Sequence, residues 1–229
     1  MRILHTSDWH LGKRLGPFAR IDEQRRVLAD VVAVANRCDV DLVLVAGDLW
    51  DVYNPSSDAV ALLYQTLKEL GGGGRRPVVA IAGNHDAPER VEAAEMLAHE
   101  SGIILCGFPD TQPCLSGSLA GAVVLRSAPG FIELQTSRCP WLVRLLLTPY
   151  ANEFRLRQYL GIDATVGLRE ALQDRWKRLS DEYCTPGGVN LLVGHLFMTS
   201  GGGDRPEEPL DEARPITTVG GAGEMWASM

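Results

Sequence analysis

The stretch "VVAIAGNHD", residues 78–86, decides the fold because a buried strand in it stops directly against polar residues. Its first five residues are small or β-branched and apolar, which is the pattern of a strand covered on both faces. The residues that follow at once are Gly83, Asn84, His85 and Asp86. This sequence is either a turn with Asn84 in the left-handed region or a set of ligands at the carboxyl end of a strand.

The segments around this strand alternate between strand and helix patterns. Short apolar runs predict four strands, at residues 2–6, 41–46, 77–82 and 102–106. Helical spacing of apolar residues between them predicts three helices, at residues 21–38, 56–70 and 89–100. The order β-α-β-α-β-α-β predicts a mostly parallel sheet covered by helices. Functional groups in such sheets gather beyond the carboxyl ends of the strands.

The second half of the chain is less regular. Strand patterns occur at 122–126 and 142–148, and helix patterns at 152–160 and 166–179. The stretch "GVNLLVGH", residues 188–195, repeats the pattern of a buried strand that ends in Gly-His. We therefore expect one domain over residues 1–199. Residues 200–229 are rich in Gly, Pro, Asp and Glu and are predicted to be a loop-rich or disordered tail.

Composition excludes several classes of protein. The five cysteines form no CxxC pair, which argues against a disulfide framework or a zinc knuckle. No apolar run approaches the roughly 20 residues of a membrane span, and the polar start is not a signal peptide, so a cytoplasmic location without membrane contact is expected. The net charge of −7 argues against a protein that coats nucleic acid through a basic surface. The charge is compatible with an enzyme whose carboxylates hold cations, because the metals restore positive charge locally.

Ligand-type side chains follow four of the predicted strands, at what we expect to be the same end of one sheet. They are Asp8 and His10 after the first strand, Asp48 after the second, Asn84 and His85 after the third, and His195 after the strand at 188–193. Carboxylate and imidazole together favour Mn, Fe or Zn over Ca or Mg. Each motif alone is commonly a turn or a core histidine, but four such coincidences at one sheet end are improbable.

The residue types also suggest separate roles. A carboxylate such as Asp48 can bridge two cations about 3.5–4 Å apart, which clamp a phosphoryl group and lower the pKa of a bound water. Asn84 suits a neutral oxygen ligand. His85 cannot easily ligate the same ion as its neighbour and is better placed to donate a proton to a leaving oxygen.

These motifs resemble those of a known superfamily. The stretches are "SDWHLG" (7–12), "VAGDLWD" (45–51), "AGNHD" (82–86) and "VGHL" (193–196), and they resemble the successive motifs of the calcineurin-like metallophosphoesterases. The resemblance implies an α/β fold layered as an α/β–β/α sandwich. More narrowly, residues 1–15 and 43–56 resemble the SbcD family, the nuclease subunits of bacterial SbcCD complexes. The resemblance is dense over residues 1–107 and returns at 189–200.

The resemblance implies roles for individual residues. The implied metal ligands are Asp8 and His10 on the first metal, Asp48 on both, and Asn84 and His195 on the second. His85 is the implied catalytic histidine. The implied cofactors are two divalent ions, most often manganese. The implied activity is exonuclease and endonuclease cleavage of DNA ends and hairpins in double-strand break repair and recombination. The implied partners are DNA, an SbcC-type coiled-coil ATPase and a second copy of the chain.

The sequence departs from the family pattern after His195. Family members have a further Gly-His-x-His motif, but no histidine follows His195 here. We therefore expect an amino-terminal fragment with a fold incomplete at its carboxyl end, without the capping domain, and with weaker binding of both metals. The alternatives are a metallophosphoesterase that acts on phosphoproteins or small phosphoesters, and a non-catalytic scaffold.

Two weaker signals flank the motifs. A basic cluster follows Asp8 and His10, and it comprises Lys13, Arg14, Arg20, Arg25 and Arg26. It is either a contact for DNA phosphates or a solvated helix face that pairs with Asp22 and Glu23. Trp50, Asp51 and Tyr53 follow Asp48. Their loop either stacks on a nucleobase or supports the site by packing.

Overall fold

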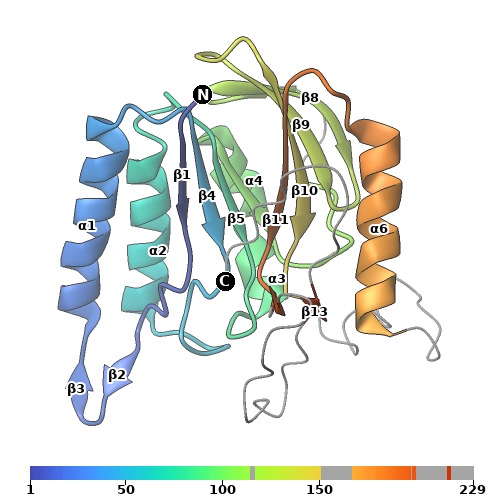
Figure 1. Cartoon of the computed structure of the whole chain (residues 1–229). Helices are drawn as coiled ribbons and strands as arrows, with labels where there is room; N and C mark the ends of the chain where they lie inside the picture. The colour runs from blue at the N-terminus through green and yellow to red at the C-terminus, as the bar shows by residue number, and fades with distance from the viewer. Residues whose placement is uncertain (114–116, 151–166, 197, 200–215, 218–229) are drawn as a thin grey trace.

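Two β-sheets lie face to face, and helical structure covers the outer side of each (Figure 1). The computed structural model describes residues 1–113, 117–150, 167–196, 198–199 and 216–217. The first sheet has the strand order β1-β4-β5-β6 and is parallel throughout. Its strands are β1 (Ile3–Thr6), β4 (Leu42–Ala46), β5 (Val78–Ile81) and β6 (Ile103–Cys106). The four strands and the parallel sheet predicted for the first half are confirmed.

Two long helices cover the outer face of the first sheet. They are α1 (Ile21–Arg37) and α2 (Ser57–Leu70), and their apolar faces join the outward side chains of the strands in one core. Helix α2 starts where predicted because the Ser56 hydroxyl accepts a hydrogen bond from the Ala59 amide at 3.4 Å. The helix ends at Gly71, also as predicted.

The single helix predicted over 89–100 is wrong. The chain forms two short helices, α3 (Pro88–Glu92) and α4 (Glu95–Glu100). The Glu92 carboxylate accepts hydrogen bonds from the amides of Gly107 and Phe108, at 2.8 and 3.3 Å. This tertiary contact anchors the end of α3 to the segment after β6, and α4 packs against β6 as a separate helix.

The second sheet has the order β11-β10-β9-β8-β7, and its β10–β11 pair is parallel while the other pairs are antiparallel. The strands are β7 (Gly117–Leu119), β8 (Ala122–Ala128), β9 (Phe131–Thr136), β10 (Leu142–Thr148) and β11 (Val189–Gly194). The expectation that all ligand-bearing strands share one sheet is therefore wrong, because β11 belongs to the second sheet. Strands β7 and β9 were not predicted from the sequence.

Apolar side chains from the facing surfaces of the two sheets fill the space between them. Helix α6 (Leu168–Tyr183) lies on the outer side of the second sheet, where Tyr183 stacks on Phe131 of β9 at a ring-centroid distance of 4.3 Å. The layers therefore follow the order helix, sheet, sheet, helix, which confirms the α/β–β/α sandwich.

Some predictions concern residues outside the described part of the chain. The helix predicted over 152–160 lies there, and so does most of the predicted tail at 200–229. Within that tail, β13 (Ile216–Thr217) pairs in parallel with β12 (Met198–Thr199). Among the described residues, no helix is both long and apolar enough to cross a membrane.

Candidate active site

The loops that follow β1 and β4 are held together beyond the ends of their strands. The amides of Asp8, His10 and Leu11 donate to the carbonyls of residues 47, 48 and 49, at 3.0, 2.9 and 3.0 Å. Strand-like pairing thus continues past the sheet, as the isolated bridge between residues 11 and 50 also indicates. As a result, Asp8, His10 and Asp48 lie close together beyond the carboxyl ends of these strands.

The backbone at these three residues is left-handed. The φ angles are 56° at Asp8, 44° at His10 and 52° at Asp48. This region is unfavourable for residues with a Cβ, and each such residue costs on the order of 1–3 kcal/mol. Strained residues of this kind cluster at functional sites, where the surrounding structure holds them in place.

Two glycines bring the loops and side chains into close contact. A Cβ on Gly83 would overlap the amide nitrogen and carboxylate of Asp48. A Cβ on Gly47, whose φ is 90°, would overlap the imidazole ring of His195. Because the site side chains pack directly on these backbones, both positions require glycine.

Asp48 lies at the centre of the cluster and is only 3% exposed. Its Oδ1 accepts a hydrogen bond from the His85 amide at 2.9 Å. Its Oδ2 lies 3.4 Å from His10 Nε2 and 3.6 Å from His195 Nε2. Burial acts to raise the pKa of Asp48, but the interaction with His195 and the hydrogen bond from the His85 amide outweigh it, so the pKa is lowered. The carboxylate is therefore ionised and faces both histidines.

His195 completes one side of the cluster. Its Nδ1 donates to the Ala46 carbonyl at 2.8 Å, so Nε2 faces the site, 3.0 Å from Asn84 Oδ1. Burial acts to lower the pKa of His195, but Asp48 and the Ala46 carbonyl raise it overall. Nε2 therefore converges with the Asn84 amide oxygen and the Asp48 carboxylate, and in the neutral imidazole its lone pair joins these two oxygens in a ligand set that fits a cation.

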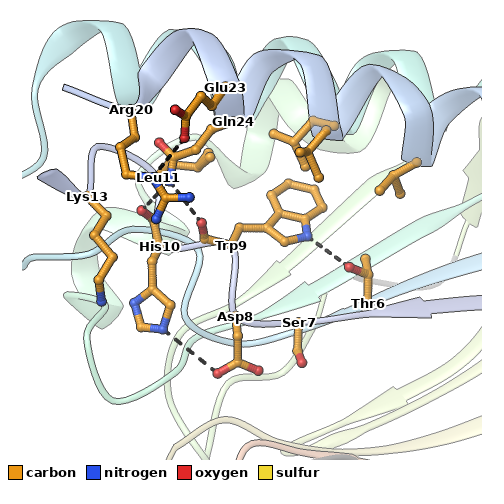
Figure 2. A pocket seen from close by; sticks show the side chains of 13 residues that line it. Thr6, Ser7, Asp8, Trp9, His10, Leu11, Lys13, Arg20, Glu23 and Gln24 are labelled. Atoms are coloured by element: carbon orange, nitrogen blue, oxygen red, sulfur yellow. Dashed lines mark hydrogen bonds and ion pairs between the residues drawn. The ribbon is translucent and has the colours of Figure 1, made fainter. Parts of the chain in front are cut away.

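His10 and Asp8 form the other side of the cluster. His10 Nε2 lies 3.9 Å from Asp8 Oδ1, and these atoms and Asp48 are close enough together for one metal ion to bind them. Figure 2 shows His10 and Asp8 pointing toward each other. Both residues line a pocket of about 460 Å³. Trp9 lies between them in sequence and donates its indole N–H to the Thr6 hydroxyl at 2.9 Å.

His85 lies beside the cluster in a fixed orientation. Its Nδ1 donates to the Asp51 carbonyl at 2.8 Å, which leaves Nε2 as the nitrogen available to a substrate. Its ring meets that of His10 edge-on, at a centroid distance of 4.8 Å. The six predicted site residues are therefore brought together from the ends of β1, β4, β5 and β11. They come from two sheets, which meet at this end through a hydrogen bond of 2.8 Å from the Tyr150 amide to the Ala82 carbonyl.

The role of Asp86 was not predicted from the sequence. This carboxylate is fully buried and accepts hydrogen bonds from the amides of Leu49, Trp50 and Gly83, at 3.0, 2.9 and 2.8 Å. Burial raises the pKa of Asp86, and the three amides oppose that rise. Asp86 therefore ties the loop after β5 to the loop after β4. The sequence feature that could have identified Asp86 is its position as the last residue of the stretch "GNHD", residues 83–86.

The contacts that Gln24 and Asp51 make at the site were not predicted either. Gln24 on α1 accepts from the Gly12 amide at 3.0 Å and donates to the His10 carbonyl at 2.7 Å, which clamps the first loop to the helix. Asp51 Oδ1 lies 3.3 Å from both His10 Nδ1 and Lys13 Nζ. Nothing in the spacing of the sequence marks Gln24, whereas Asp51 ends the stretch "VAGDLWD".

The basic cluster and the aromatic residues after Asp48 were each given two interpretations, and individual residues agree with different ones. Arg20 pairs with Glu23 at 2.9 Å, as expected for a solvated helix face. Lys13 instead pairs with Asp51, which also contacts His10 of the cluster. Trp50 is fully buried and so supports the site by packing. Tyr53 is exposed.

Comparisons with known proteins agree with this geometry. Over 224 residues the chain is 34% identical to the SbcD component of the nuclease SbcCD from Bacillus subtilis, a match that covers 97% of this chain and 51% of the relative. Over 143 residues it is 38% identical to the same component of the nuclease SbcCD from Rhodobacter capsulatus, a match that covers 62% of this chain and 35% of the relative. The chain thus spans about half the length, or less, of these curated relatives.

The family-level match is more extensive. The model of the calcineurin-like phosphoesterase family matches residues 1–226, which includes all the elements that form the cluster. The two facing sheets and the carboxylates and imidazoles at their common end agree with that match. The chain belongs to the calcineurin-like phosphoesterase family.

Proposed function

We propose that this chain carries the catalytic site of a nuclease that depends on two divalent metal ions and hydrolyses phosphodiester bonds in DNA. The observation that carries the proposal is the position of Asp48 Oδ2, which lies between His10 Nε2 at 3.4 Å and His195 Nε2 at 3.6 Å. A carboxylate oxygen between two imidazoles, each with a further oxygen donor beside it, suits a bridging ligand between two cations.

The residues present suit the two metals. Asp8 and His10 would hold one ion, Asn84 and His195 the other, and Asp48 both. Mixed oxygen and nitrogen donors suit manganese, iron or zinc, and we propose manganese. When bound, the ions would supply positive charge to the phosphoryl oxygens and acidify a water molecule.

The chain's own residues would orient the substrate and move a proton. His85 Nε2 would donate a proton to the leaving oxygen. The hydrogen bond from His85 Nδ1 to the Asp51 carbonyl holds the ring so that Nε2 remains available for this task. Lys13, anchored to Asp51 at 3.3 Å, would contact a phosphate beside the site.

Two observations favour DNA over other phosphoesters. The first is the name of the relatives, which are components of SbcCD nucleases. The second is the excess of basic residues over 12–26, which is complementary to a phosphate backbone. A metallophosphoesterase for phosphoproteins or small phosphoesters is the second candidate, because the same metal chemistry serves both.

The test is manganese-dependent cleavage of end-labelled linear and hairpin DNA, with Asp48→Ala as the inactive variant. Asp30→Ala is the matched control, because Asp30 is an exposed carboxylate on α1. We expect cleavage by the wild type and by Asp30→Ala but not by Asp48→Ala. Hydrolysis of p-nitrophenyl phosphate without DNA cleavage would favour the second candidate. A folded wild-type chain that hydrolyses neither DNA nor p-nitrophenyl phosphate would favour a non-catalytic scaffold.

We also propose the partners that the relatives suggest, an SbcC-type ATPase and a second copy of the chain, with a role in DNA repair and recombination. Support for the homodimer comes from Met96 and Leu97 on α4, which are 83% and 76% exposed. Light scattering should give the mass of a dimer for the wild type and of a monomer for Leu97→Lys. A monomeric wild type at all concentrations would reject the homodimer.

A further inference from the structure

Gln24 on α1 makes three hydrogen bonds to the backbone of the loop that carries His10. Its Nε2 donates to the carbonyls of Trp9 and His10, at 3.2 and 2.7 Å, and its Oε1 accepts from the Gly12 amide at 3.0 Å. Figure 2 shows the side chain reaching from the helix to this loop. Other amides of the loop donate to the loop after β4, so two separate sets of hydrogen bonds hold it.

The amide group of Gln24 has one orientation that satisfies all three contacts. Exchanging its nitrogen and oxygen would set an oxygen against two carbonyls. The side chain starts near the beginning of α1, one turn before Leu28, which is 4% exposed in the core. Since residues four apart share a helix face, Gln24 lies on the side of α1 that packs on the first sheet.

The covalent connection between the loop and α1 is indirect. It runs through a hairpin of β2 (Arg14–Leu15) and β3 (Phe18–Ala19), which projects beyond the end of α1 (Figure 1). Leu15 and Phe18 are paired across its strands, and each is 70% exposed. Because the hairpin extends into solvent, the Gln24 side chain is a more direct link between the loop and the helix than the connecting chain.

Gln24 restrains the backbone on both sides of the His10 Cα. The Trp9 carbonyl belongs to the peptide group before His10, and the His10 carbonyl belongs to the peptide group after it. Since peptide groups are planar, their orientations define φ and ψ of His10. Its φ of 44° is unfavourable for a residue with a Cβ. Bonds from one NH₂ group to both carbonyls therefore stabilise this conformation and set the direction of the imidazole.

The ligands proposed for the second ion are positioned by other groups. His195 Nδ1 donates to the Ala46 carbonyl at 2.8 Å, and His195 Nε2 lies 3.0 Å from Asn84 Oδ1. Loss of the Gln24 contacts should therefore affect the two metal sites unequally.

We infer that Gln24 is a positioning residue for the first metal ion and sets the affinity of that site alone. It acts through the backbone of His10 and not through a ligand atom. The inference rests on the proposed function, because it takes Asp8, His10 and Asp48 as the ligands of this ion. It goes further by giving a residue of α1 control over one of the two sites.

The test is manganese binding by the whole chain, measured by calorimetry, with Gln24→Met as the variant. Methionine has a similar length and can pack on the same helix face, but it makes none of the three hydrogen bonds. Loss of a group that positions a metal ligand typically weakens metal binding about 10-fold to 100-fold, and we expect this loss for the first ion only. Gln65→Met is the matched control, because Gln65 is an exposed glutamine on α2 that pairs with Glu69 at 2.9 Å.

Two backgrounds assign the loss to one site. His195→Ala keeps Asp8, His10 and Asp48, and there Gln24→Met should weaken binding by the same factor. His10→Ala keeps the ligands of the second ion, and there Gln24→Met should have no effect. Electron paramagnetic resonance gives an independent signature, because two Mn²⁺ ions about 3.5–4 Å apart are magnetically coupled. At a manganese concentration that just fills both wild-type sites, Gln24→Met should give the spectrum of an uncoupled ion.

Three outcomes would overturn the inference. Unchanged affinity for the first ion in a folded Gln24→Met would overturn it and leave the proposed function intact. Equal weakening in the His195→Ala and His10→Ala backgrounds would also overturn it, because that result indicates a general loosening of the fold. A wild-type chain that binds no manganese would overturn the proposed function as well. If Gln24→Met does not fold, Gln24→Glu takes its place, since it keeps the acceptor for the Gly12 amide and loses only the donor.

Discussion

Replacing Asp86 tests whether the geometry of the candidate site depends on one buried carboxylate. Asp86 Oδ2 accepts from the amides of Leu49 and Gly83, and Oδ1 accepts from the amide of Trp50. Asp86→Ala removes all three acceptor contacts and leaves three buried amides without them. Asp86→Asn can keep an oxygen at the Oδ2 position but places an NH₂ group against the Trp50 amide.

The two variants should therefore lower the free energy of unfolding by different amounts. A hydrogen bond to a charged group contributes about 1.5–3 kcal/mol to stability. Asp86→Ala loses three such bonds but also removes the cost of burying a carboxylate. We therefore expect a net loss of about 3–5 kcal/mol in the free energy of unfolding. Asp86→Asn loses one bond and sets donor against donor, so we expect a loss of about 1–3 kcal/mol. Both variants should bind manganese more weakly, because the loops that carry Asp48 and His85 are no longer tied together.

The measurements are urea unfolding followed by tryptophan fluorescence and manganese titration by calorimetry. The exposed carboxylate of Asp30 provides the matched control, as Asp30→Asn, which should change neither quantity. Equal losses of stability in Asp86→Ala and Asp86→Asn would refute the reasoning that individual amide contacts set the magnitude. Unchanged manganese affinity in a folded Asp86→Ala would refute the coupling between this carboxylate and the site.

Three further predictions concern other positions. Gly83→Ala should abolish manganese binding in calorimetry, because its Cβ would overlap Asp48, whereas Gly167→Ala, which has open space around it, should not. Arg76→Leu should lower the free energy of unfolding in urea by about 3–5 kcal/mol, since this buried guanidinium donates to carbonyls at the ends of α1 and α2; a loss below about 1 kcal/mol would contradict this. Hydrogen bonds from Arg126 and Arg144 outweigh burial and lower the pKa of Glu133 below its usual value. The ionised Glu133 therefore contributes fully to stability at neutral pH. This contribution is lost as pH falls below about 4.5 and through the lowered pKa. Unfolding of Glu133→Gln should therefore depend less on pH between about 5 and 2 than unfolding of the wild type, and parallel profiles would argue against this.

The first half of the fold could be predicted because its signals are local. An apolar run such as 78–82 forms a buried strand in many proteins, and a helix with clear end signals, such as α2 with Ser56 and Gly71, forms in the same way elsewhere. The second half could be predicted only in part. Strand β9 was missed because its sequence, "FIELQT", includes Glu133, whose charge is compensated by Arg126 and Arg144 from neighbouring strands. The break between α3 and α4 was missed because it depends on the contact of Glu92 with the loop after β6.

The residues of the candidate site were predictable as a set because each follows a strand end directly in the sequence. The residues that position them were not. Gln24 lies on a helix in the middle of a polar sequence, and only the packing of α1 against the first loop brings its amide to the His10 carbonyl. The hairpin at 14–19 was predicted only as part of a basic cluster, because its exposed apolar face has no pattern that distinguishes it from a short loop.

The sequence by itself determined the identity and order of the ligand-type residues and the parallel sheet that carries Asp8, His10, Asp48 and Asn84. These features depend on the periodicity of side chains along one strand or helix, which a short window contains. Only the tertiary structure decided that His195 comes from a second sheet, 111 residues from its partner Asn84. It also decided that Asp48 Oδ2 lies between two imidazoles. Distances between such residues are set by how two sheets pack on a shared apolar core, and no local pattern contains that information.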